Sequence, residues 1–273
     1  MAYNTMCTHD NENNNIAIVG KIVNLHRELA QMLGYETYAD YALSQRMAEN
    51  TPNVHKLLND LIDAYMPTAL AEVKEVEDLY YEDNDIDPST LSESDPRRFM
   101  PWYFSFYSNK LKERKFNINS EMLRPYFQLS KVKEGVFGLA TKLYGITFRK
   151  NTDAPVYHLD VDVYDVIDKD GTPLALFYCD FHPRASKKSG AWMTSFKEQW
   201  ISKEGTNSRP QVSIVMNFSK PTENKPALLT LDEVETFLHE FGHSLHGIFA
   251  NTTYSSLSGT NVYWDFVELP SQF

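Results

Sequence analysis

The sequence predicts a mainly α-helical protein with a small antiparallel β-sheet, an α+β fold with a metal site on one helix. Three observations lead to this prediction. Apolar residues recur every three or four positions from Asn15 to about Leu143, which is the helical period. Residues 156–168 instead alternate apolar and acidic side chains, as half-buried strands do. A helical pattern returns at Thr230 and carries the segment FLHEFGHSLH.

Helices account for the first half of the chain. The first is expected to stop at Gly34 and the last at Gly145, because glycine readily takes the left-handed backbone conformation that follows a helix. Pro67 should kink or divide the longest one, since proline lacks the N–H donor and clashes with the preceding turn. The expected helices cover residues 16–32, 38–49, 54–82, 101–113 and 130–144.

Strands follow the helices. The alternating segment 156–168 is joined by KDG, a good hairpin turn, to the apolar segment 172–181, and QVSIVMNF at 211–218 is a further strand. We therefore expect a helical region over residues 1–145 and a catalytic region with the sheet and the HExxH helix over residues 146–273.

Composition excludes several classes of partner. The chain has 26 Lys and Arg residues and 37 Asp and Glu residues, which gives a formal charge of −11. This charge disfavours a nucleic acid as a partner. No apolar run is long enough to cross a membrane, and the first residues lack the order of a signal peptide. Cys7 and Cys179 lie far apart, so we expect two plain small side chains in a reducing compartment. We accordingly expect a cytoplasmic protein with no membrane partner.

The segment 237–246 contains the pattern H-E-x-x-H in His239, Glu240 and His243. Two histidines four residues apart on a helix lie on one face, about 6 Å apart along the axis, so their nitrogens can converge on one zinc ion. Glu240 lies beside that face, where it can take the proton of a water at the metal instead of binding the metal. The pattern indicates a zincin-type helix with catalytic Glu240.

A catalytic zinc needs a third protein ligand. His246 is close in sequence, but seven residues span about 10.5 Å along a helix, so it is better placed to support the site than to share the ion with His239. Asp265 and Glu268, three residues apart, are expected on a flank of a following helix. Spacing alone leaves both carboxylates open as the third ligand.

Longer motifs resemble a known family. HEFGHSLHGIFA and YSSLSGTNVYWDFVELPSQ are similar to the active-site segment of the M3 (thimet oligopeptidase-like) zinc metallopeptidases, and SLSGTNV with DFVELPSQ is more similar to the peptidyl-dipeptidase Dcp branch than to the oligopeptidase A branch. Upstream, RELAQMLGYETYADYAL and DVIDKDGTPLALFYCDFHPRASKKSGAW also resemble family segments, so the likeness covers essentially all 273 residues.

The resemblance implies a gluzincin site with one Zn²⁺ per chain. By the family pattern the metal ligands are His239, His243 and Glu268, and Glu240 is the general base. His239 and Glu268 are 29 residues apart, which agrees with the spacing in the family pattern. Asp265 is then either a supporting acceptor or a surface carboxylate, and His246 a supporting or packing residue.

Family members are longer at both ends, so the sequence resembles an internal fragment that ends just after the third zinc ligand. The family's glycine-rich loop, with a histidine and tyrosines that bind substrate, has no match here, and this chain is expected to be slow or inactive without it. The resemblance also implies that the helical region 1–145 lines a narrow substrate channel.

Residues 189–193 are a candidate sheet edge for an extended peptide, because Ser189, Gly190 and Ala191 permit close backbone approach. The alternative is that Gly190 and Ala191 only make a tight bend. The charges just before them, Arg184, Lys187 and Lys188, are either solvated turn charges or substrate contacts.

We therefore expect hydrolysis of short peptides by release of C-terminal dipeptides. The alternatives are an oligopeptidase of the same family that cuts internally and, for this chain, a zinc- and peptide-binding segment without turnover.

Overall fold

The protein was analysed as a computed structural model that describes residues 15–118 and 120–272. It forms two compact units, residues 1–119 and 120–273, which are described separately here. The helix at 129–144 contributes to the core of the second unit. The division at residue 145 into a channel-lining and a catalytic region stays a prediction. The first fourteen residues, with Cys7, lie outside the described residues.

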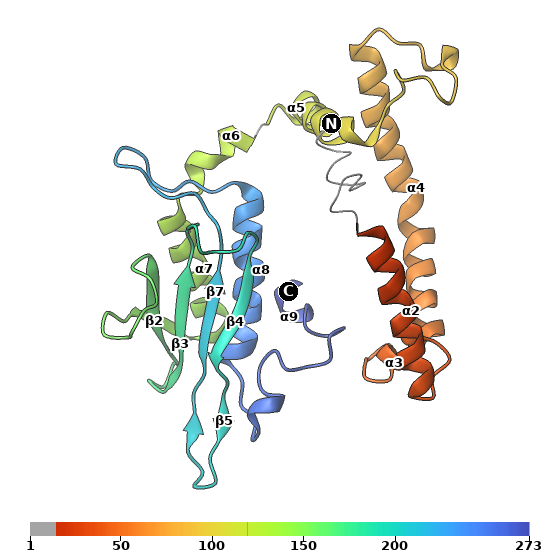
Figure 1. Ribbon diagram of the computed structural model, residues 1–273. Helices are drawn as coiled ribbons and strands as arrows, with labels where there is room; N and C mark the ends of the chain where they lie inside the picture. The colour runs from red at the N-terminus through yellow and green to blue at the C-terminus, as the bar shows by residue number, and fades with distance from the viewer. Residues whose placement is uncertain (1–14, 119, 273) are drawn as a thin grey trace. The chain divides into compact units, whose positions relative to one another are not determined.

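The first unit is helical. Its helices are α2 (Ile16–Met32), α3 (Tyr38–Leu43), α4 (Thr51–Asp83) and α5 (Phe104–Phe116), with the short 3₁₀ helices η1 (Pro88–Thr90) and η2 (Pro101–Tyr103) between α4 and α5 (Figure 1). Gly34 follows α2 with φ of 85°, as expected for the residue that ends a helix. Aromatic rings dominate the core of this unit, where Tyr80 stacks on Tyr103 at 4.9 Å.

Pro67 does not divide α4, which runs unbroken from Thr51 to Asp83. Of the two expected outcomes the division was wrong, and a kink at Pro67 stays a prediction. A proline inside a helix removes one backbone hydrogen bond. The hydrogen-bonded turns on both sides of it remain and are sufficient to keep the helix continuous.

The second unit contains a five-stranded sheet in the order β1-β2-β3-β7-β4. The strands are β1 (Thr147–Lys150), β2 (Val161–Ile167), β3 (Pro173–Asp180), β4 (Trp192–Lys197) and β7 (Gln211–Val215). A two-stranded ribbon of β5 (Trp200–Ile201) and β6 (Asn207–Ser208) extends between β4 and β7. The predicted hairpin is confirmed, since β2 and β3 pair antiparallel across the turn with Gly171 at φ of 87°.

The sheet is mixed, and the expectation of a purely antiparallel sheet was wrong. Strand β7 pairs parallel with β3 and antiparallel with β4. Strand β4 begins within the candidate edge 189–193 and runs on to Lys197, and it lies at the far edge so that β7 pairs between β3 and β4. Both inner strands are buried along most of their length, as parallel-paired strands generally are.

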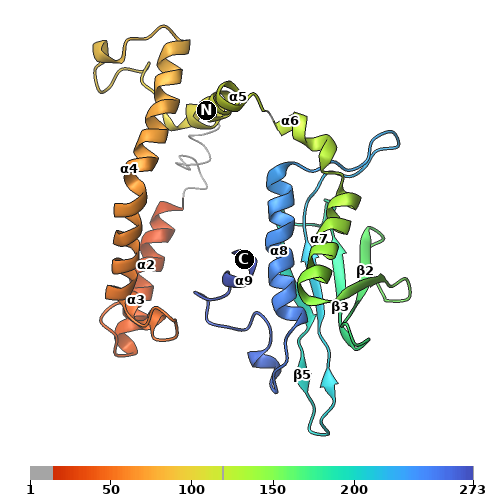
Figure 2. The ribbon, with the colours of Figure 1, turned by 180° about the vertical axis from the view of Figure 1, so that it is seen from behind.

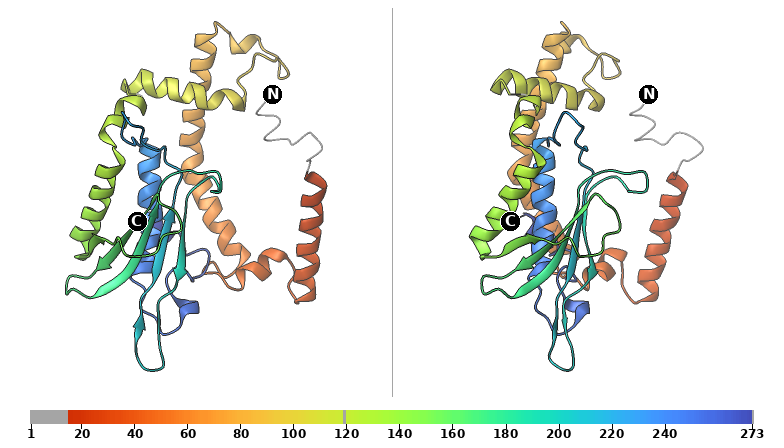
Figure 3. Two further views of the ribbon diagram at one scale, coloured as in Figure 1. Left: turned by 60° about the vertical axis from the view of Figure 1, so that its left-hand side comes forward. Right: turned by 90° about the vertical axis from the view of Figure 1, so that its left-hand side faces the viewer.

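Helices α7 (Leu129–Tyr144) and α8 (Leu231–Ile248) lie side by side on one face of the sheet (Figures 2 and 3). Aromatic side chains of the two helices contact each other on this face of the sheet, and the ring centroids of Phe137 in α7 and Phe241 in α8 lie 6.0 Å apart. Gly145 ends α7 with φ of 79°, as predicted. Cys179 is buried in this core, consistent with a plain small side chain.

Short elements complete the second unit. They are α6 (Ser120–Leu123), η3 (Arg124–Tyr126), η4 (Ser255–Leu257) and α9 (Leu269–Gln272). The last of these packs on α8. None of the described helices is long and apolar enough to cross a membrane.

Candidate metal centre

Helix α8 carries the H-E-x-x-H pattern and is fixed at its start by a capping box. The Thr230 hydroxyl accepts from the backbone N–H of Glu233, and the Glu233 carboxylate accepts from the backbone N–H of Thr230. Asp232 and Glu233 in the first turn complement the positive end of the helix dipole. The helix buries Phe237, Phe241 and Ile248 against the sheet, which sets the rotation of its other side chains.

The two histidines of the pattern face a single carboxylate. Their ring centroids lie 4.9 Å apart with nearly perpendicular planes. Glu268 Oε2 lies 3.2 Å from His239 Nε2 and 3.1 Å from His243 Nε2. One ligand atom from each residue lies within 4.8 Å of the other two. The structure thus brings together the three residues that the sequence analysis named as ligands.

The donor set can be tested against the requirements of zinc. Tetrahedral Zn²⁺ with ligands at about 2.0 to 2.1 Å holds neighbouring ligand atoms about 3.4 Å apart. Both nitrogen–oxygen separations are close to that value. The Glu268 side chain is 58% exposed, which leaves solvent access on its side of the site. Two imidazoles and one carboxylate with an open side fit a catalytic zinc.

Glu268 reaches the histidines from a turn, and the expectation that it lies on a helix was wrong. Residues 264–268 form turns directly before α9. Ser271 of α9 donates its hydroxyl to Glu268 Oε2 at 2.7 Å and holds the carboxylate in place. This hydrogen bond, with the nearby histidines, lowers the pKa of Glu268. The carboxylate is therefore ready to act as an anionic ligand at neutral pH.

Glu240 occupies a different environment from the ligand carboxylate. The residue is only 7% exposed, and burial raises the pKa of its carboxyl group. A buried carboxylate with a raised pKa is suited to accept a proton and pass it on.

The remaining histidine of α8 lies outside the ligand group. His246 is half-buried, and its ring contacts Phe266 edge to face at 6.3 Å. Burial lowers the pKa of both His243 and His246. Within the described part of the chain, the buried Nδ1 atoms of these two histidines have no hydrogen-bond partner. Asp265 is exposed in the turn that leads to Glu268.

The candidate peptide-binding residues precede the edge strand β4. Ser189 and Gly190 are exposed, and Gly190 bends the chain with φ of 94°. Ala191 lines a cavity of about 920 Å³ together with His239 and Glu240. The segment is thus a bend that leads into the edge strand β4, and its role in binding an extended peptide stays a prediction.

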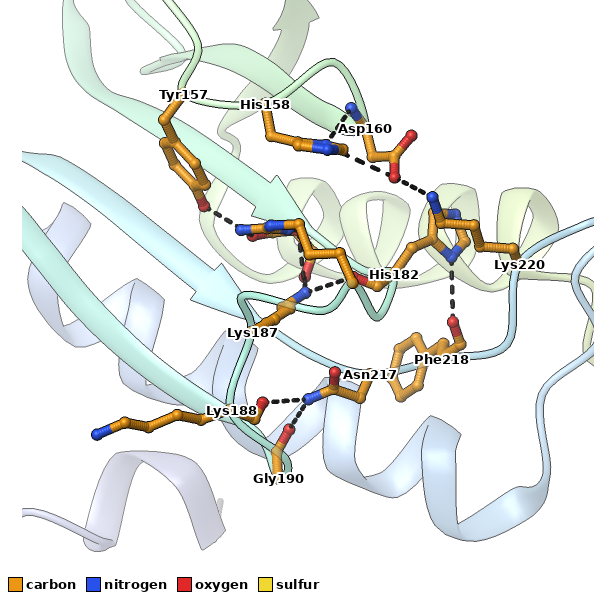
Figure 4. A network of polar contacts seen from close by, with 12 residues as sticks. Tyr157, His158, Asp160, His182, Lys187, Lys188, Gly190, Asn217, Phe218 and Lys220 are labelled. Carbon is orange, nitrogen blue, oxygen red and sulfur yellow. Dashed lines mark hydrogen bonds and ion pairs between the residues drawn. The ribbon is translucent and has the colours of Figure 1, made fainter.

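A polar network fixes the loop before that bend. Asp180, at the end of β3, has a fully buried side chain that accepts two hydrogen bonds from Arg184 at 2.8 and 2.9 Å. Tyr157 donates to Asp180 Oδ2 at 2.9 Å, and Lys187 donates to Oδ1 at 3.0 Å (Figure 4). Lys187 is 2% exposed, so the suggestion that Arg184 and Lys187 are solvated turn charges was wrong.

A further pair of hydrogen bonds fixes the bend at residues 188–190. The side-chain amide of Asn217, just after β7, donates to the carbonyl oxygens of Lys188 and Gly190 at 2.9 and 2.8 Å (Figure 4). Sequence reasoning missed Asp180 and Asn217. The intervals of four and three between Asp180, Arg184 and Lys187 imply contact only within a helix, and nothing in the sequence marks Asn217 as a neighbour of the site.

Comparison with known proteins agrees with this geometry. The model of peptidase family M3 matches residues 1–273, the whole chain. The chain belongs to peptidase family M3. Dipeptidyl carboxypeptidase of Salmonella typhimurium is 40% identical over 257 residues, which are 94% of this chain and 36% of that protein. Oligopeptidase A of the same organism is 35% identical over 277 residues, 100% of this chain and 39% of that protein. Saccharolysin of Saccharomyces cerevisiae is 34% identical over 266 residues, which are 94% of this chain and 37% of that protein.

This M3 peptidase chain therefore spans between a third and two fifths of the length of these relatives. The relatives carry both names, dipeptidyl carboxypeptidase and oligopeptidase, and resemblance to them does not distinguish the two modes of cleavage.

Proposed function

We propose that the protein is a zinc-dependent peptidase that removes dipeptides from the C-terminus of short peptides. The observation that carries the proposal is the convergence of His239, His243 and Glu268 beside buried Glu240. His239 and His243 would bind the metal through Nε2, and Glu268 through Oε2. When bound, Zn²⁺ would polarise the scissile carbonyl group and lower the pKa of a water molecule.

Glu240 performs the proton transfer in this proposal. Because burial raises its pKa, the Glu240 carboxylate holds a proton more readily. It can therefore accept the proton of the attacking water and deliver it to the departing amine. The carboxyl groups of Glu240 and Glu268 thus take different roles because burial raises the pKa of one and hydrogen bonding lowers that of the other.

An extended substrate is proposed to run past Ser189, Gly190 and Ala191. The support is that β4 pairs with β7 on one side only and so presents an edge to which a peptide strand can add. Ala191→Leu places a larger side chain on this path. It should raise KM several-fold and leave zinc affinity unchanged, whereas an unchanged KM would count against this path.

The decisive experiment combines zinc analysis with one isosteric substitution. We expect about one zinc per chain, lost or weakened in Glu268→Ala. Glu240→Gln should keep zinc and peptide binding and lose cleavage, because the amide cannot accept the proton. Cleavage that survives in Glu240→Gln would refute this mechanism, and absence of zinc from the parent would refute the metal site.

The mode of cleavage is tested with a nonapeptide that has a free C-terminus, with the C-terminally amidated peptide as control. Successive dipeptides from the free peptide favour a peptidyl-dipeptidase, and one internal cut favours the oligopeptidase alternative. Binding of zinc and peptide without any cleavage favours the third alternative, a binding segment that needs further parts of a longer protein. The cytoplasmic location and the channel-lining role of residues 1–145 stay predictions.

A further inference from the structure

The third ligand depends on an unusually close approach of two backbones. Helix α8 and the short helix α9 touch at Gly242, which lies between Glu240 and His243 in the sequence. A Cβ atom added to Gly242 would lie 2.4 Å from the carbonyl oxygen of Pro270 and 2.7 Å from Ser271 Cα. Both distances are far below ordinary van der Waals contact. Since both atoms belong to the backbone, a side-chain rotation cannot relieve the clash.

The element that Gly242 contacts is the one that holds Glu268. The hydroxyl oxygen of Ser271 lies 2.7 Å from Glu268 Oε2 and 2.8 Å from the Glu268 carbonyl oxygen, so its single hydrogen is shared between these two acceptors. The backbone N–H of Gln272 donates to the same carbonyl oxygen at 3.0 Å. Glu268 and α9 therefore move as one piece, and the distance of α9 from α8 sets the distance of Glu268 from the histidines.

We propose that Gly242 is a positioning residue whose missing side chain sets the height of α9 over α8 and thereby places Glu268 as the third metal ligand. This inference rests on the proposed zinc site. To relieve a contact of 2.4 Å, α9 must move away by about 1 Å. Metal sites tolerate deviations of about 0.2 Å in ligand distance. The displacement exceeds the tolerance, so a methyl group at position 242 disturbs Glu268 without touching it.

The same reasoning separates Gly242 from an ordinary helical glycine. Gly138 of α7 has open space around the position of a Cβ atom. Alanine there should stabilise the helix slightly, because glycine is the poorer helix former. Gly138→Ala is therefore a matched control that makes the same chemical change in the same unit.

The test measures zinc affinity by competition with a chromophoric chelator, and circular dichroism of the metal-free proteins. Gly242→Ala should bind zinc about 10- to 100-fold more weakly than the parent, the range found when groups that orient metal ligands are replaced. Gly138→Ala should bind as the parent does. Equal affinity of Gly242→Ala and parent would overturn the proposal while leaving the zinc site intact, whereas a parent that binds no zinc overturns the site and the inference together.

A double-mutant cycle shows whether Gly242 acts through Glu268. In the Glu268→Ala background, Gly242→Ala should cause no further loss of zinc affinity, because the ligand that it displaces is already gone. A full additional loss would mean that the methyl group damages α8 and its histidines, and would overturn the proposal. So would a Gly242→Ala protein without the parent's helical circular dichroism, since the contact would then serve the fold as a whole.

Discussion

The second unit contains two clusters of polar side chains that satisfy their hydrogen bonds to very different degrees. Around Asp180 the buried carboxylate accepts from Arg184, Lys187 and Tyr157, and Lys187 also donates to two carbonyl oxygens. Around His243, the described residues supply no partner for the Nδ1 atoms of His243 and His246. The first cluster is paired among the described residues, whereas in the second the ligand atoms of His239, His243 and Glu268 converge where a metal ion can bind.

This difference separates a structural role from a ligand-binding role. A buried polar cluster whose members are all paired rigidifies the chain around it, and the Asp180 cluster holds the loop that leads to Ser189 and β4. A cluster with converging nitrogen and carboxylate atoms carries a cost until a ligand arrives. The following predictions test the comparison, from the largest expected effect to the smallest.

The largest effect should come from breaking the complete cluster. Asp180→Ala leaves Arg184 and Lys187 without their carboxylate, and the Lys187 side chain is only 2% exposed. Removing one partner of a buried ion pair costs about 3 to 5 kcal/mol. We expect a fall of that size in the free energy of unfolding in urea.

The control for this variant is an exposed pair. Asp78→Ala breaks a pair with Lys74 in which both side chains are more than half exposed, and the stability should change little. If Asp180→Ala were as mild as Asp78→Ala, the Asp180 cluster would not be a structural support.

The next effect is the stabilisation of the incomplete cluster by its ligand. Zinc at 100 times its dissociation constant should raise the free energy of unfolding of the parent by about 2.7 kcal/mol. Glu268→Ala should lose most of this gain. Asp180→Asn, compared at the same ratio of zinc to dissociation constant, should keep it, because the two clusters share no residue. Loss of the zinc effect in Asp180→Asn would show that the clusters are coupled.

The contrast between the clusters also explains what the sequence could predict. Helix α8, its Thr230 cap and the His239–His243 pair follow from local spacing, and the structure agrees. The position of Glu268 needed the family pattern, because the turn that carries it has no periodicity.

The Asp180 cluster was not predicted because intervals of four and three residues imply contact only within a helix, and this segment is a loop. The charges therefore looked solvated. The parallel pairing of β3 with β7 was missed for a similar reason, since β4 lies between them in the chain and its place in the sheet depends on non-local pairing.

A smaller effect is expected from removing the unpaired nitrogen of the incomplete cluster. His243→Leu should abolish zinc binding and raise the stability of the metal-free protein by about 1 kcal/mol, because a buried polar atom without a partner is replaced by an apolar group. His239→Leu is the matched control. Because the His239 side chain is 33% exposed, this substitution should raise the stability of the metal-free protein less. Destabilisation of the metal-free protein by His243→Leu would contradict the prediction that the unpaired Nδ1 atom of His243 lowers stability.

The smallest effect is a change of stability with acid pH that arises from Asp180. Burial by itself would raise the pKa of Asp180, but hydrogen bonds from Arg184, Lys187 and Tyr157 outweigh it, so the pKa is lowered. In the unfolded chain this carboxyl group titrates near about 3.9. The stabilisation is therefore complete above about pH 4 and is lost as the pH falls through the folded-state pKa, because the unfolded state binds the proton first. Urea unfolding of the parent at a series of pH values from about 5 downwards should show this loss in addition to that from other carboxylates, and Asp180→Asn should show a shallower decline. An identical slope for parent and variant would mean that Asp180 has the same proton affinity in both states, and that its buried pairing contributes no pH-dependent stability.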